Sequence, residues 1–419
     1  MTPAARLSAA IEVLDRIASS RQPADQVLKA WGVHNRYAGS GDRRAIADRV
    51  YACLREQGGQ MTTGEGSGRR MVLASLGLPL PEIEALFSGQ GHAPAALTDE
   101  EREWLAGSSG EPDLPAFIRS ELQRVFGADW TEEAQALLKS RAPLSLRVNT
   151  VKSDVPAVAE AVFEHGYPFE AARMSAVGLR VQPGADVQAF DLFEAGAFEV
   201  QDEGSQVAAW LVDARPGETV VDYCAGGGGK TLALGQMLQG QGTLVASDLN
   251  PRRLDAIRPR LRRAGVTADL RSLEKPAVMA DLVGKADRVL VDAPCSGSGT
   301  WRRRPEEAWR LTEAEVQRLH AVQLEVLAQA AALVKPGGRL AYATCSVLPA
   351  ENGDVAVEFA AGHRDFRPLP VSEAAKTPLL TDFARARLAE LSAGGHTVQL
   401  SPRRTDTDGF FIALFERTL

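Results

Sequence analysis

Short apolar runs alternate with amphipathic stretches through the second half of the chain. The short runs are rich in β-branched residues and predict buried strands, whereas apolar residues spaced three or four apart between them predict helices. This alternation indicates an α/β fold with a doubly wound parallel sheet from residue 201 onward, in which ligands bind at the carboxyl ends of the strands. We expect strands at 219–223, 243–247, 269–272, 288–291, 339–344 and 410–415, and helices at 231–239, 251–264 and 313–334.

The first half of the chain has a different pattern. Apolar residues at helical spacing over 5–17 and 43–55 predict a helical N-terminal region, in which Cys53 is interpreted as a core residue. Predicted helices and strands then alternate over residues 112–200, which indicates a small α/β unit. We therefore predict three domains, a helical domain at 1–110, a small α/β domain at 112–200 and the doubly wound domain at 201–419. The remaining expected features are glycine-rich breaks at 58–68 and 107–115, helices at 115–126, 132–140 and 155–165, and strands at 144–148 and 178–181.

Composition narrows the class of protein. The 419 residues are 45% hydrophobic, enough for sizeable cores, yet no apolar run approaches the roughly 18 residues of a membrane span. Charged residues near the N-terminus argue against a signal peptide. Four cysteines without paired spacing and six scattered histidines argue against disulfides and metal sites. We therefore expect a cytoplasmic protein without metal or membrane partners. We also predict that it is a monomer.

Charge is unevenly distributed. The net charge is −7, which is not the overall balance of a nucleic-acid-binding protein. Residues 1–70, however, carry 11 Lys and Arg against 7 Asp and Glu, whereas residues 81–136 carry 3 against 12. Local basic faces for nucleic acid are compatible with this distribution.

The sequence VVDYCAGGGGKT, at 220–231, predicts a buried strand, a tight glycine turn and a helix start. Glycines let the backbone approach a ligand closely, and the free N–H groups of a helix start favour an anionic group. The spacing does not match a P-loop. By itself the loop favours a nucleotide-like cofactor over a plain tight turn.

Four further acidic or thiol side chains follow predicted strands. Asp248 ends the second strand, where a carboxylate suits ribose hydroxyls, although it could instead cap the next helix. Asp292 and Cys295 follow the fourth strand, and Cys345 follows the fifth. Neighbouring strand ends would bring the two cysteines close together, and burial of both as ordinary core thiols is the alternative.

A nucleoside-type cofactor beside two thiols fits methylation of cytosine at carbon 5. A thiolate that adds to carbon 6 activates the ring, and a carboxyl group near nitrogen 3 stabilises the adduct. A base must then remove the proton on carbon 5. A cation such as Lys230 would favour the thiolate, although a solvated helix start would also explain that lysine.

Several motifs carry a family resemblance. The chain resembles the Sun-type, RsmB-like RNA cytosine-carbon-5 methyltransferases, and its N-terminal helices are similar to a NusB-like RNA-binding domain. The resemblance is carried by VVDYCAGGGGKT, SDLN (247–250), DRVLVDAPCSGSGTWRRRPEEAW (287–309), VKPGGRLAYATCS (334–346), TDGFFIALFER (407–417), FEVQDEGSQ (198–206), LSLRVNT (144–150) and GDRRAIADRVYACLRE (41–56).

The resemblance implies S-adenosylmethionine as the cofactor, held in a Rossmann-like domain. Asp248 would hold its ribose, and Asp292 would lie between the cofactor and the target cytosine. Cys345 would be the nucleophile and Cys295 would assist release, a choice that spacing alone leaves open. The methionine end of the cofactor would be lined by Cys224, Ala225, Gly226, Gly227, Gly228, Gly229 and Lys230.

Two positions depart from the family pattern. The family loop reads Ala-Pro-Gly-Gly-Lys, whereas this chain has four glycines before Lys230, so the rigidity of the proline is lost. The family also has an Asp near the end of the third strand on the adenosine side of the cofactor. Glu274 is the candidate substitute here.

The resemblance implies ribosomal RNA, specifically the 16S RNA of the small subunit, as the substrate. The alternatives are a tRNA cytosine-5 methyltransferase and a non-catalytic RNA-binding factor in ribosome assembly. Arginines at 302–304, beside the predicted target pocket, favour phosphate contact, and Trp301 would either stack a base or pack. A second cluster is interpreted equally well as a phosphate-binding face or a solvated helix face: Arg252, Arg253, Arg258, Arg260, Arg262 and Arg263.

Overall fold

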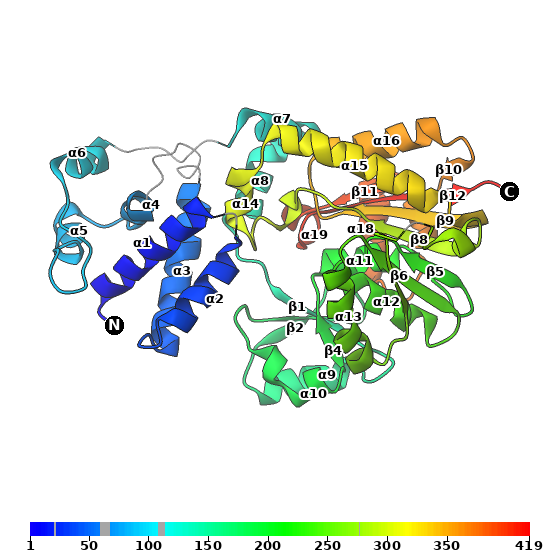
Figure 1. Cartoon of the computed structure of the whole chain (residues 1–419), viewed down its shortest axis with the longest axis horizontal. Helices are drawn as coiled ribbons and strands as arrows, with labels where there is room; N and C mark the ends of the chain where they lie inside the picture. Colours follow the sequence, from blue (N-terminus) through cyan, green and yellow to red (C-terminus); the bar gives the residue numbers. More distant parts are fainter. Residues whose placement is uncertain (21, 59–67, 108–113, 276) are drawn as a thin grey trace. The chain divides into compact units, whose positions relative to one another are not determined.

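The computed structural model describes residues 1–20, 22–58, 68–107, 114–275 and 277–419 (Figure 1). The chain divides into two compact units. One contains Met1–Ser120 with Trp301–Leu311, and the other contains Glu121–Thr300 with Thr312–Leu419. The three domains at 1–110, 112–200 and 201–419 stay a prediction, and most of the two predicted glycine-rich breaks lies outside the described residues.

The N-terminal unit is built of helices around one apolar core, as the helical spacing predicts. Leu14 of the first helix and Val50 of the third are completely buried in that core, and so is Cys53. Thr2 caps the first helix by accepting the N–H of Ala5. The helices are α1 (Pro3–Ser19), α2 (Ala24–His34), α3 (Ser40–Gln57), α4 (Gly68–Ser75), α5 (Leu80–Leu86), α6 (Asp99–Gly107) and α14 (Pro305–Arg310).

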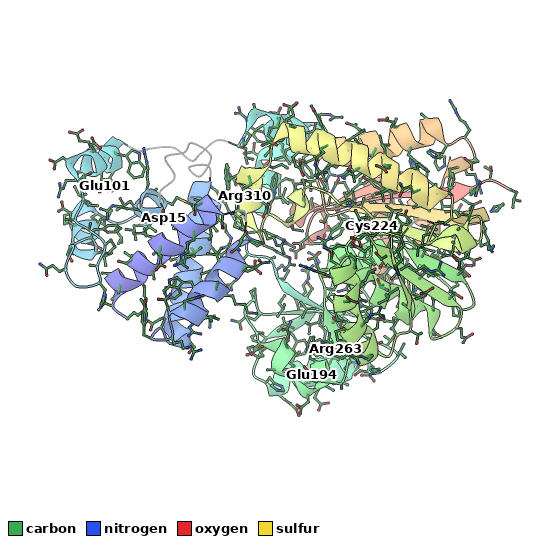
Figure 2. All side chains as sticks on the ribbon, in the orientation of Figure 1. Asp15, Glu101, Glu194, Cys224, Arg263 and Arg310 are labelled. Carbon is green, nitrogen blue, oxygen red and sulfur yellow. The ribbon has the colours of Figure 1, made fainter. Side chains whose placement is uncertain are left out.

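Helix α14 belongs to this unit although its sequence follows the Pro-Cys loop. Glu306 accepts the N–H of Ala24 at 2.9 Å. Arg310, labelled in Figure 2, donates to the main-chain oxygens of Ile17 at 2.7 Å and Ser20 at 3.1 Å. The Arg310 guanidinium thus forms hydrogen bonds with carbonyl groups at the end of α1, where the helix itself offers no N–H partners. The sequence pattern did not predict this placement.

The second unit contains a small antiparallel sheet of order β2-β3-β1-β4. Val158 and Val162 of α9 are buried against this sheet together with Phe198. Earlier in the chain, α8 packs on α19, and Glu133 accepts the hydroxyl of Ser401 at 2.8 Å. Helix α7 (Ala116–Phe126) includes the boundary between the two units in the sequence. The other elements are α8 (Trp130–Leu138), β1 (Leu144–Val148), α9 (Val155–Glu164), β2 (Phe169–Ala171), β3 (Gly178–Val181), α10 (Asp191–Glu194), β4 (Phe198–Val200) and α19 (Pro402–Thr405).

A large sheet of order β10-β12-β9-β8-β5-β6-β7 follows, with β11 beside β12. Its central strands from β9 to β7 pair in parallel, which confirms the doubly wound α/β prediction. The strands are β5 (Thr219–Asp222), β6 (Thr243–Asp248), β7 (Asp269–Ser272), β8 (Ala286–Asp292), β9 (Val334–Thr344), β10 (Phe366–Pro368), β11 (Thr397–Leu400) and β12 (Phe410–Arg417).

Helices cover both faces of this sheet (Figure 1). Successive strand residues point to opposite faces, so Val220 packs in the core with α11 and α12, and Val221 packs in the core with α15 and α16. The helices are α11 (Glu203–Trp210), α12 (Gly229–Leu238), α13 (Pro251–Ala264), α15 (Glu313–Ala331), α16 (Gly353–Gly362), α17 (Val371–Ala374) and α18 (Asp382–Ser392).

The prediction of a parallel sheet is wrong for the last strand. β12 runs antiparallel to β9, with Phe411 opposite Thr344. An apolar run shows that a strand is buried but not its direction, and the short strands β10 and β11 that accompany β12 gave no clear pattern.

Candidate active site

The two cysteine loops leave the sheet side by side. β8 and β9 pair in parallel with Asp292 opposite Ala343, so the segments that follow emerge at the same edge. The Sγ atoms of Cys295 and Cys345 lie 3.4 Å apart. This confirms the prediction that neighbouring strand ends bring the two thiols together.

A buried ion pair joins the glycine loop to the Pro-Cys loop. Lys230, 7% exposed in the first turn of α12, donates from Nζ to Oδ2 of Asp292 at 2.8 Å. Its ammonium also lies 4.9 Å from the ring centre of Phe410. Burial alone would lower the pKa of Lys230, but the charge and hydrogen bond of Asp292 outweigh it and raise that pKa. Asp292 therefore stabilises the charged form of Lys230 in this buried position.

The environments of the two thiols differ. The hydrogen bond to Cys345, followed by burial, raises the pKa of the Cys295 thiol well above its ordinary value. Cys345, in contrast, interacts electrostatically with the Lys230 ammonium. The two thiols are therefore in contact with each other but have different electrostatic surroundings.

The glycine loop has a backbone that only glycine adopts easily. Gly226 has φ +54° and Gly228 has φ +81°. A Cβ on Gly228 would come within 2.8 Å of the Ile257 side chain. Cys224, labelled in Figure 2, lies where β5 enters the loop, and burial raises the pKa of its thiol far above the ordinary value. The loop therefore presents a narrow backbone cradle beside a neutral thiol.

Asp248 closes the other side of this loop. Its Oδ2 accepts the N–H of Gly226 at 2.9 Å, and its Oδ1 accepts the N–H of Asn250 at 2.7 Å. The side chain that caps α13 is Asn250, not Asp248. The helix-cap alternative for Asp248 is therefore wrong. Glu274 lies on the turn after β7 and is exposed; the main chain of that turn is tied to Asp248 because Leu273 donates to its carbonyl at 3.0 Å.

A further carboxyl group is buried beneath the loop. Asp222 ends β5, is 0% exposed and accepts the hydroxyl of Thr231 at 2.6 Å. Burial raises its pKa to about 7.

The arginine clusters divide into paired and exposed members. On α13, Arg260 and Arg263 pair with Glu199, and Arg252, Arg253 and Arg262 are exposed. In the segment assigned to the N-terminal unit, Trp301 is completely buried, which favours packing over base stacking. Arg302 is 3% exposed, so the phosphate contact predicted for 302–304 is wrong for this side chain, whereas Arg304 is exposed.

Comparison with known proteins places this site in a family. Residues 209–416 match the family described as 16S rRNA methyltransferase RsmB/F. The chain is 32% identical over 318 residues to the ribosomal RNA small subunit methyltransferase B of Pseudomonas putida, covering 75% of this chain and 70% of that protein. The chain belongs to the RsmB/F methyltransferase family.

Other similarities agree with RsmB/F membership. Residues 114–188 match the ferredoxin-like domain of RsmF/B-like methyltransferases. A 28S rRNA (cytosine-C(5))-methyltransferase of Mus musculus is 30% identical over 307 residues, covering 72% of this chain and 38% of that protein. The crystal structure of PH0851 superposes with a TM-score of 0.77 at 25% identity, covering 100% of this chain and 99% of that one.

Two polar residues of this RsmB/F chain were missed by sequence reasoning. Glu351 lies completely buried between the two cysteine loops. Arg147 of β1 donates to Gln201 at 2.7 Å and to Gln236 of α12 at 2.9 Å, and burial lowers its pKa to about 10. Arg147 lay inside a motif that we used for resemblance, whereas no spacing singled out Glu351.

The described part of the chain has neither a membrane-spanning helix nor a cluster of metal ligands. No helix there is long and apolar enough to cross a bilayer. No group of three or more His, Cys, Asp or Glu side chains gathers there as metal ligands would.

Proposed function

We propose that this protein is an S-adenosylmethionine-dependent RNA (cytosine-5)-methyltransferase that modifies small-subunit ribosomal RNA through a covalent Cys345–cytosine adduct. The observation that carries the proposal is the pair of thiols 3.4 Å apart at the carboxyl edge of the sheet, next to the Lys230–Asp292 ion pair. Membership of the RsmB/F family supports the same reaction.

In this proposal each side chain has one task. Cys345, as a thiolate favoured by the Lys230 cation, forms a bond from sulfur to carbon 6 of the cytosine. Asp292 stabilises the adduct at nitrogen 3 of the ring. Once carbon 5 carries the methyl group, Cys295 in its thiolate form takes the proton on carbon 5. The electrons of that C–H bond restore the ring double bond, and the bond to Cys345 breaks so that Cys345 leaves as a thiolate.

The residues present fit the cofactor. The glycine at 228 lets the loop backbone pass close to Ile257, where a Cβ would come within 2.8 Å, and the buried carboxylate of Asp248 lies at the strand end where a ribose is expected. Glu274 is the proposed contact on the adenosine side. When bound, S-adenosylmethionine supplies the methyl group. The methionine end would be held by residues 224–230.

The substrate base must be unpaired or extruded from a helix to reach Cys345. We further propose that the helical domain at 1–110 is NusB-like and contributes RNA contacts. The excess of Lys and Arg in residues 1–70 supports this role. The protein is expected to act as a monomer.

The test is transfer of tritium from labelled S-adenosylmethionine to small-subunit rRNA and, in parallel, to tRNA, followed by bisulfite sequencing of the labelled RNA. We expect 5-methylcytosine in the ribosomal RNA alone. Label only in tRNA would favour the tRNA alternative, and no label in any RNA would favour a non-catalytic assembly factor.

A further inference from the structure

One buried carboxylate contacts both cysteine loops. Glu351, at the end of the short 3-10 helix η6 (Pro349–Glu351), is 0% exposed. Its Oε2 accepts the hydroxyl of Ser296 at 2.5 Å and the hydroxyl of Ser346 at 2.6 Å. Ser296 directly follows Cys295, and Ser346 directly follows Cys345. The two loops are thus bonded to the same oxygen atom.

The second oxygen strengthens the contact with the Pro-Cys loop. Oε1 of Glu351 accepts the main-chain N–H of Ser296 at 2.7 Å and the amide of Gln323 at 3.2 Å. The same amide of Gln323 donates to the carbonyl of Pro294 at 2.9 Å, and the Tyr342 hydroxyl donates to the main-chain oxygen of Glu351 at 2.5 Å. Glu351 is therefore itself held on two sides.

The chemistry of this contact requires an acceptor. An ionised carboxylate accepts hydrogen bonds and donates none, so it fixes the direction of both serine hydroxyls. Four donors compensate the cost of burying its charge. The charge also acts on the thiol: together with the stronger effects of the Cys345 hydrogen bond and of burial, it raises the pKa of Cys295 and so its affinity for a proton.

We propose that Glu351 is a positioning residue that clamps Ser296 and Ser346 and thereby holds Cys295 beside Cys345 for release of the methylated base. This inference rests on the proposed function. Glu351 makes two of its bonds to Ser296, next to Cys295, and one to Ser346. Its loss should therefore impair release by Cys295 more than attack by Cys345.

The test compares Glu351→Gln with wild type under turnover with S-adenosylmethionine and small-subunit rRNA. Turnover and the fraction of protein trapped as a denaturation-resistant RNA adduct are both measured per folded protein. A displaced general base costs on the order of 10–100-fold in rate. We expect turnover to fall by about that factor while the trapped fraction rises. Ser296→Ala, which keeps the main-chain bond, should show the same change more weakly and carries the test if Glu351→Gln does not fold.

The matched control is Glu358→Gln on α16, whose carboxylate is 61% exposed and pairs with His320 on the surface. It should behave as wild type. The inference is overturned if turnover and trapped adduct fall together in Glu351→Gln, or if neither changes. A wild-type protein that transfers no methyl group to any RNA would instead refute the proposed function, so the two failures are distinguishable.

Discussion

Replacing Asp222 by Asn should change how the stability of the protein depends on pH. The carboxyl group is completely buried at the end of β5, where Oδ2 accepts the Thr231 hydroxyl. Among the described residues Oδ1 has no hydrogen-bond partner. Asn keeps the shape and an oxygen for Thr231 but cannot ionise, so the substitution removes only the titration.

The magnitude follows from proton linkage. Burial raises the pKa of Asp222 from 3.8 to about 7, so the folded protein binds more protons than the unfolded chain between these values. The stability that this group contributes is full below pH 3.8 and is lost as the pH rises through about 7. Three pKa units correspond to about 4 kcal/mol, of which roughly 2–3 kcal/mol is lost between pH 5 and pH 8.

The assay is urea denaturation of wild type and Asp222→Asn at pH 5, 6, 7 and 8, followed by circular dichroism. Groups that titrate in both proteins cancel, as does any constant cost of the buried amide. The free energy of unfolding of Asp222→Asn minus that of wild type should grow by about 2–3 kcal/mol from pH 5 to pH 8. Asp255→Asn, whose parent side chain is 72% exposed, is the control and should show no such trend. A difference between Asp222→Asn and wild type that stays constant over this range would refute the reasoning.

Three other predictions follow from the same geometry. Gly228→Ala should weaken S-adenosylmethionine binding more than Gly226→Ala. Both glycines have positive φ, but only a Cβ at Gly228 would meet a neighbour within 3 Å. Equal binding affinities of the two variants in calorimetry would contradict this prediction. Arg310→Met removes hydrogen bonds to main-chain oxygens near the end of α1 and should destabilise the helical unit by about 1.5–3 kcal/mol. Hydrogen–deuterium exchange of the amides in α1 should become faster, and unchanged exchange would contradict this prediction. Hydrogen peroxide should join Cys295 and Cys345 as a disulfide, with two waters formed, and abolish methylation until dithiothreitol is added; inactivation that dithiothreitol does not reverse would argue against it.

The part of the site that sequence predicted depends on local patterns. Three predicted strands are followed directly by glycines, by Asp-Ala-Pro-Cys or by Thr-Cys. In a parallel sheet, residues that directly follow a strand lie at the carboxyl edge, whatever the position of that strand in the sheet. That rule alone predicted that Cys295 and Cys345 lie close together, and in the structure their Sγ atoms are 3.4 Å apart. The roles of the two thiols came from family resemblance and stay predictions.

The part that sequence did not predict depends on contacts between distant segments. Glu351 is a single acid at the end of a short 3-10 helix, and only the fold brings it to Ser296, 55 residues away. Helix α14 joins the helical unit through Glu306 and Arg310, whose partners are more than 280 residues earlier. The direction of β12 is likewise set by its pairing with β9, because its apolar run is compatible with either direction.

The most direct test of the central claim is covalent trapping with the two cysteine variants. Cys295→Ala and Cys345→Ala are each incubated with small-subunit rRNA and S-adenosylmethionine, denatured, and resolved by gel electrophoresis. If Cys345 forms the adduct and Cys295 releases it, Cys295→Ala should accumulate a protein–RNA band of reduced mobility and Cys345→Ala should form none. An adduct in Cys345→Ala that is absent from Cys295→Ala would contradict the assignment of the two thiols.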